Sequence, residues 1–136
     1  LDGSPIINPP GPVLARFNKD YSVVKDVNWA EDGVYYYASY NDQKTNLSRR
    51  IVYDTQGNVV STEFEVSNKN YPQCIGDYCT KNYPNENTRI WTSKDSNGKR
   101  SYFSKYDKTI VWFDKNGKYI ATMPARFYNQ QPITIK

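Results

Sequence analysis

A ten-residue pattern occurs twice in this chain, sixty positions apart. Residues 53–62 read YDTQGNVVST, and residues 113–122 read FDKNGKYIAT. Four further pairs match at an offset of sixty-two: Pro10 with Pro72, Val13 with Ile75, Tyr21 with Tyr83, and Trp29 with Trp91. Self-similarity at a fixed period indicates a repeated structural unit and constrains the fold more than local propensity does. We therefore expect two copies of one unit.

Each copy is predicted to begin with a short helix. Pro12 suits the opening turn of the first helix, and Asn70 and Pro72 suit the start of the second. The second helix should end at Tyr83, because a residue before proline is displaced from the α region. The apolar stripes at helical spacing are Val13, Leu14 and Phe17 in the first copy, and Ile75, Tyr78 and Cys79 in the second.

Strands are expected after each helix, where β-branched and aromatic runs are bounded by Asp, Asn and Gly. The runs are 23–29, 34–40, 49–53 and 58–66 in the first copy, and 88–92, 100–106, 109–113 and 118–123 in the second. The predicted fold class is α+β, a tandem repeat of a short helix packed on a four-stranded antiparallel meander. Halves of about sixty residues bury little surface alone, so we expect them to be joined in one unit.

The predicted organisation has four parts. Residues 1–11, rich in Pro and Gly, form an N-terminal linker; 12–68 are repeat 1, 69–125 are repeat 2, and 126–136 are a C-terminal tail. The chain begins with Leu1 and shows no signal peptide, which is typical of a trimmed product. We therefore expect an exported protein.

The repeated Asp-x-(Gln/Asn)-Gly element could be read as a pair of catalytic carboxylates, Asp54 and Asp114. A turn is the better interpretation, because Asp bonds the backbone two residues on and Gly supplies the positive φ that closes a hairpin. The run from Asp95 to Gly98 resembles part of a calcium loop but lacks its further acidic ligands. We predict a hairpin turn there too.

The composition gives no sign of catalysis. The chain has no histidine, which removes the commonest general base and neutral metal ligand. It contains neither a glycine-rich phosphate loop nor a recognisable nucleophile motif. We predict a protein that is not an enzyme and needs no cofactor or metal.

Charge and hydropathy argue against two kinds of partner, a nucleic acid and the interior of a membrane. The net charge is +4, without a long basic run, and Arg49-Arg50 and Lys99-Arg100 are its densest points. A solvated surface is favoured over a nucleic-acid site, which would gather its charge on one face. The sequence contains no apolar stretch of the length that a membrane span needs, so none is predicted.

The two cysteines, Cys74 and Cys79, are five positions apart. On an unbroken helix this spacing turns their side chains to different faces and beyond disulfide reach. Two small, half-buried residues are therefore favoured. A disulfide remains open if Gly76 allows an irregular turn, and a metal or redox site is the third alternative.

Strand alternation divides the sheet side chains into two sets. The set expected to face the helices contains Ile51, Tyr53, Val60, Thr62, Val111, Phe113, Ile120 and Thr122, joined by Tyr36, Ala38, Tyr40, Tyr102, Ser104 and Tyr106, with Trp29 and Trp91 in the core. The opposite set contains Tyr35, Tyr37, Val52, Val59, Phe103, Trp112 and Tyr119.

The second set, which we call the aromatic set, is the candidate binding surface. An open sheet face is normally polar, whereas Tyr and Trp dominate binding hot spots. The tail at 126–136 or a second subunit could instead cover these side chains. A register error of one residue would exchange the two sets.

These features together resemble the PepSY-like family of small exported Bacteroidetes proteins. The resemblance covers about residues 12–123 and rests on Phe17, Tyr21, the strand at 27–29, the aromatic strand after it, and aromatic-Asp-x-x-Gly with its repeat. It implies a fold similar to the β-lactamase inhibitor protein (BLIP), a periplasmic or cell-surface location, and no catalysis. In that fold the open sheet face and its loops bind the target enzyme. Ser22 and the polar loop after Tyr40 depart from the simplest pattern.

The leading functional hypothesis is an exported, protein-binding and inhibitor-like module that uses the aromatic set. The alternatives are a small-molecule or glycan binder and a structural module that dimerises. The expected partner is an unidentified protein, and the expected state is a monomer or a weak homodimer.

Overall fold

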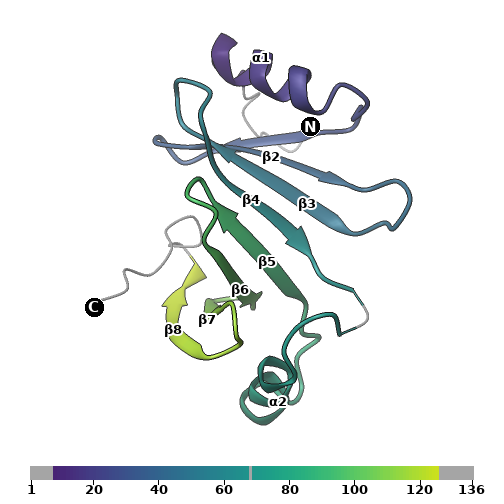
Figure 1. The fold of residues 1–136 in the computed structure, drawn as a ribbon, viewed down its shortest axis with the longest axis vertical. Coiled ribbons are helices and arrows are strands. Elements are labelled where there is room, and N and C mark those ends of the chain that lie inside the picture. Colours follow the sequence, from purple (N-terminus) through teal and green to yellow (C-terminus); the bar gives the residue numbers. More distant parts are fainter. Residues whose placement is uncertain (1–7, 68, 126–136) are drawn as a thin grey trace. The chain divides into compact units, whose positions relative to one another are not determined.

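The structure is a computed structural model that describes residues 8–67 and 69–125 (Figure 1). The elements are α1 (Gly11–Asp20), β1 (Asn28–Glu31), β2 (Tyr36–Asn41), β3 (Ser48–Tyr53), β4 (Val59–Glu65), α2 (Gln73–Asn82), β5 (Ile90–Asp95), β6 (Arg100–Lys105), β7 (Thr109–Asp114) and β8 (Tyr119–Pro124). The predicted tail at 126–136 and most of the predicted linker lie outside the described residues.

The strands form an eight-stranded antiparallel sheet ordered β1 to β8, so each strand pairs with its neighbours in the chain. This confirms the α+β class. The chain divides into two compact units between Glu63 and Phe64, near the end of β4. Each unit is described by itself below, and the predicted division into repeats remains a prediction.

Both helices begin after a proline and end at a tyrosine. Pro10 and Pro72 are the N-caps, and Tyr21 and Tyr83 are the C-caps. The Tyr21 N–H donates to the Phe17 carbonyl, and the Tyr83 N–H donates to the Cys79 carbonyl, both at 2.8 Å. The predicted end of the second helix at Tyr83 is thus confirmed, whereas its N-cap is Pro72 and not the predicted Asn70. In the described ranges, neither helix has the length and hydrophobicity that a bilayer crossing requires.

Two strands differ most from their predicted ranges, and the others differ by one or two residues at an end. β1 covers only Asn28–Glu31, because pairing with β2 starts at Asn28↔Ser39. β5 continues beyond the predicted end at residue 92 to Asp95. Its pairing with β6 extends to Lys94↔Arg100, immediately before the turn that joins the two strands.

Three hairpins share one turn, built on Asp54, Asp95 and Asp114. In each, the carboxylate accepts hydrogen bonds of 2.8–2.9 Å from the backbone N–H groups two and four residues on. The turn glycine donates its N–H to the Asp carbonyl at 3.0–3.1 Å, and its φ is between 82° and 87°. This confirms the turn interpretation, because each carboxylate is engaged by its own backbone.

In two of these hairpins the turn glycine lies directly against the start of a helix. A Cβ on Gly57 would lie 2.5 Å from the Pro12 carbonyl oxygen in unit 1. In unit 2 a Cβ on Gly117 would lie 2.5 Å from Cys74 Sγ and 2.7 Å from Pro72 Cβ. Gly98, in the third turn, has no such neighbour within 4 Å. Glycine at residues 57 and 117 therefore serves both the turn and the docking of the helix.

The core of unit 1 lies between α1 and one face of β1–β4. Val13 and Phe17 pack on Ala38, Ile51 and Tyr53, and all five are buried. Around them lie Trp29, Tyr36 and Tyr40, as predicted, together with Val59, which was assigned to the opposite face.

The core of unit 2 lies between α2 and one face of its strands. Ile75 and Cys79 pack on Ile90, Tyr106, Val111 and Phe113. Trp91 lies in a different cluster, stacked on Phe103 with the ring centroids 5.8 Å apart. Ile90 takes the helix side instead, because it pairs with Ser104, just as Trp29 pairs with Ala38 in unit 1. The sequence match of Trp29 with Trp91 is therefore not a match of position.

We expect Gly117→Ala to lower the free energy of unfolding more than Gly98→Ala does. Both substitutions place a side chain at positive φ, which costs about 1–2 kcal/mol. Only Gly117→Ala also forces a methyl group against Pro72, and overpacking of this kind costs about a further 1–3 kcal/mol. Urea denaturation of the two variants measures the difference. Equal losses would contradict the close contact.

Alkaline pH should destabilise the core of unit 2 through Tyr106. This side chain is 8% exposed, stacks on Tyr83 at 4.0 Å, and shares a 2.9 Å hydrogen bond with the Thr88 hydroxyl. Burial raises the pKa of Tyr106 to about 12, whereas an unfolded tyrosine titrates at about 10. Between these pH values the unfolded chain loses the proton first, so the free energy of unfolding falls as pH rises.

Urea unfolding at several pH values above about 9 tests this linkage. We expect a shallower fall with pH in Tyr106→Phe than in the unsubstituted protein. The same slope in both proteins would contradict the assignment to Tyr106.

Candidate functional site

The aromatic set does not form an open surface. Tyr37, Val52, Phe103 and Trp112 are buried, Tyr35 and Val59 are half-buried, and Tyr119 is 45% exposed. The expectation of an exposed aromatic sheet face is therefore wrong for four of the seven residues. A role of the set in binding remains a prediction.

In unit 1, polar groups cover the buried members of the set. Tyr37 pairs with Val52 across β2 and β3, and its hydroxyl donates to Asp32 at 2.5 Å. The Arg50 guanidinium lies over the Tyr37 ring, 4.9 Å from its centroid, and bonds Glu63 at 2.8 Å. Burial, followed by the bond to Asp32, raises the pKa of Tyr37 far above its ordinary value. These polar groups cover a part of the sheet that the alternation of side chains along the strands predicted to be exposed.

In unit 2, the buried members belong to an apolar cluster. Phe103 and Trp112 pack with Ile110, and Trp91, Ile120 and Met123 lie against them. The Trp112 Nε1 and the Ser101 hydroxyl are buried without a hydrogen-bond partner. These residues form a second hydrophobic core of unit 2, on the face of its strands opposite α2.

An irregularity in the β7–β8 pairing explains the change of faces in β8. Trp112 pairs with Ala121, but the next residue, Phe113, pairs with Tyr119, so Ile120 is an extra residue between them. One extra residue moves the side chains that follow it to the other face. Tyr119 therefore lies on the α2 side and Ile120 on the opposite side, the reverse of the prediction.

The Tyr119 ring is exposed but held in place. It stacks on Tyr78 of α2, with centroids 5.3 Å apart and planes 23° apart, and meets the Phe113 ring at 81°. Its hydroxyl is 2.8 Å from the Thr122 hydroxyl. One ring face and one edge are thus fixed by neighbours, and the rest of the side chain is available to a partner.

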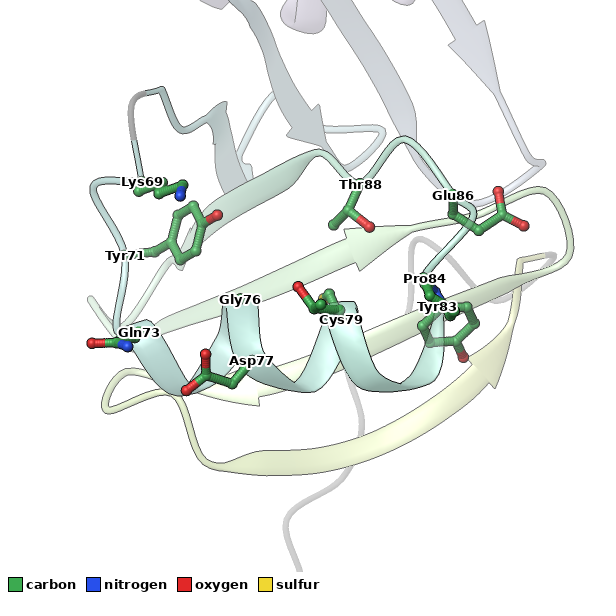
Figure 2. Close-up of a pocket in the computed structure, with 11 residues that line it drawn as sticks. Lys69, Tyr71, Gln73, Gly76, Asp77, Cys79, Tyr83, Pro84, Glu86 and Thr88 are labelled. Atoms are coloured by element: carbon green, nitrogen blue, oxygen red, sulfur yellow. The ribbon is translucent and has the colours of Figure 1, made fainter.

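A groove of about 500 Å³ runs beside α2 in unit 2 (Figure 2). Lys69 and Tyr71 lie at one end and Tyr83 and Glu86 at the other. Gly76, Cys79 and Thr88 lie between the two ends.

The polar groups along the middle of this groove already have partners. The Thr88 hydroxyl bonds Tyr106, and Cys79 Sγ is 3.8 Å from the Ser104 hydroxyl. Lys69 and Glu86 at its ends are exposed to solvent. None of the buried polar atoms without a partner among the described residues lines the groove. The described residues of the groove therefore offer a small ligand no buried polar atom that lacks a hydrogen bond.

Cys74 and Cys79 are both free thiols on the unbroken helix α2. Cys79 is buried in the core, while Cys74 is exposed and its Sγ donates to the Gly117 carbonyl at 3.2 Å. The disulfide alternative is therefore wrong for this structure, because the helix turns the two side chains to different surroundings. Within residues 8–67 and 69–125, no group of three or more metal-ligating side chains comes together.

No protein-family profile and no curated protein matches this chain. Solved structures from Bacteroides are similar in fold. A DUF2874 family protein from Bacteroides ovatus is 17% identical, with a TM-score of 0.67 over 88% of this chain and 90% of the other. A BLIP-like protein from Bacteroides fragilis is 18% identical, with a TM-score of 0.58 over 91% and 92%.

A third structure, of a protein of inferred periplasmic location from Bacteroides eggerthii, is 12% identical, with a TM-score of 0.69 over 86% and 89%. At these identities the similarities establish the fold alone. They confirm the BLIP-like fold that the sequence resemblance implied.

Proposed function

We propose that this protein is a non-enzymatic, exported module that binds a protein partner, with Tyr119 at the centre of the contact. The observation that carries the proposal is the state of its ring, which is 45% exposed although Tyr78, Phe113 and Thr122 hold it in place. Tyrosine is enriched among the residues that dominate binding energy. A ring that is already ordered loses little conformational entropy when a partner covers it.

The surroundings of Tyr119 support a protein interface. Lys115 and Lys118 are exposed beside it, in the turn that precedes β8. An aromatic centre with a charged rim is the usual composition of such interfaces. The rest of the aromatic set would then support Tyr119 from within the fold.

The similar structures support export and binding only by analogy of fold. One of them is a BLIP-like protein and another has an inferred periplasmic location. Inhibition of an enzyme is the finer form of the proposal and depends on the same analogy. The PepSY-like assignment remains a prediction from the sequence.

We also infer that the chain is a tandem repeat. Matching hydrogen bonds at the helix ends support this, because the Val13 N–H bonds the Pro10 carbonyl and the Ile75 N–H bonds the Pro72 carbonyl, both at 3.0 Å. Each helix is followed by four strands in the chain. On this interpretation the exposed tyrosine, Tyr119, is a feature of the second copy alone.

The proposal predicts that a partner is lost when the Tyr119 ring is removed. The tagged protein, Tyr119→Ala, Tyr119→Phe and Val23→Ala would each be incubated with an envelope fraction of the source cells, and bound proteins quantified by mass spectrometry. Val23, 83% exposed in unit 1, is the matched control for an exposed apolar side chain. We expect one protein that Tyr119→Ala loses by about tenfold or more, the range of a hot spot.

Tyr119→Phe and Val23→Ala should retain that protein, since the first keeps the stacked ring and the second leaves unit 2 unchanged. Thermal unfolding of each variant establishes that it is folded. Equal recovery on all four proteins, or recovery on none, would contradict the proposal. Release of a bound sugar or other small molecule without a protein would favour the glycan-binding alternative.

A further inference from the structure

Basic charge is divided unevenly between the two units. Residues 8–63 contain six Lys and Arg and seven Asp and Glu, a net charge of −1. Residues 64–125 contain ten Lys and Arg and six Asp and Glu, a net charge of +4. The mild overall excess thus belongs to unit 2.

The strand register collects part of this charge in one row. Lys94 of β5 is directly opposite Arg100 of β6, and the pair Ser101↔Asp114 places Arg100 next to Lys115. The Asp114 N–H donates to the Lys118 carbonyl at 2.8 Å, which places Lys118 at the same end of β8. All four basic side chains are exposed. Four strands at the usual spacing give this basic row a width of about 14 Å.

Among the described residues, the carboxylates nearest to the basic row form no ion pair with it. One oxygen of Asp95 and one of Asp114 accept backbone N–H groups of their own turns. Over the described part of the chain, none of the four basic residues takes part in an ion pair. The other dense basic point of the sequence differs, since Arg49 bonds Asp42 and Arg50 bonds Glu63.

Like charges directly opposite each other across two strands destabilise the sheet. Lys94 and Arg100 form such a pair. The start of α2 lies at the same end, where Gly117 touches Pro72, and its first turn contains no acidic residue. The positive end of the helix dipole therefore adds to the field of the basic row. An anionic group placed there would relieve this repulsion.

We propose that the basic row of Lys94, Arg100, Lys115 and Lys118 binds an acidic patch on the protein that Tyr119 contacts. The inference rests on the proposed function and names the chemistry of its partner. Strand alternation places Lys94 and Arg100 on the α2 side of the sheet, the side on which Tyr119 lies. Lys115 and Lys118 lie in the turn that leads into Tyr119. A narrow row beside one ordered aromatic ring matches a protein patch better than a long polyanion, which would need a continuous basic track.

Binding of a fluorescein-labelled oligoglutamate peptide, followed by anisotropy, tests the charge preference. The row variant is Lys94→Gln/Arg100→Gln/Lys115→Gln/Lys118→Gln. The control is Lys19→Gln/Lys25→Gln/Lys44→Gln, which removes three exposed lysines from unit 1. We expect the row variant to bind about tenfold or more weakly and the control to stay within about twofold. Affinity of the unsubstituted protein should fall between about 50 and 200 mM salt.

Equal losses in both variants would overturn the inference, because net charge would then explain the binding. The inference would also be overturned if the same row bound heparin more tightly than oligoglutamate. Tighter binding of vesicles of phosphatidylglycerol and phosphatidylcholine would have the same consequence. The capture experiment with the envelope fraction distinguishes a failure of this inference from a failure of the proposed function. A partner that Tyr119→Ala loses but the row variant retains would overturn the acidic partner alone.

Discussion

The close contact between a hairpin glycine and the first turn of a helix organises each unit. Gly57 approaches Pro12 in unit 1, and Gly117 approaches Pro72 and Cys74 in unit 2, at distances that leave no room for a Cβ. Because the hairpin also fixes the register of its two strands, this contact places the helix over a defined face of the meander. The division of the aromatic residues between core and surface follows from it.

In unit 2 an irregularity in the β7–β8 pairing also determines which side chain is exposed at the surface. The extra residue Ile120 between two β7–β8 pairs brings Tyr119 to the helix side, where Tyr78 of α2 holds its ring. In regular pairing Ile120 would be opposite Phe113, and Tyr119 would lie on the face of the cluster of Phe103, Ile110 and Trp112. The proposed binding surface at Tyr119 thus lies next to the turn that docks the helix.

The sequence predicts much of the fold because its signals are local. The proline and tyrosine at the helix ends, the Asp-x-x-Gly turns and the helix-facing residues Ile51, Tyr53, Val111 and Phe113 all appear where expected. The candidate site was less predictable. Alternation cannot detect the extra residue Ile120, nor that Arg50 and Asp32 cover Tyr37. Lys94 and Lys118 are far apart in the chain, and only the strand register makes both of them members of the basic row.

The most direct test of this account is the side-chain register of β8 in solution. A nuclear Overhauser spectrum with assigned aromatic rings reports which residues lie within a few ångströms of one another. The account predicts contacts from Tyr119 to Tyr78 and Phe113, and from Ile120 to the cluster of Phe103, Ile110 and Trp112. Contacts from Tyr119 to Trp112, with Ile120 against Tyr78, would contradict it and would remove the tyrosine from the proposed surface.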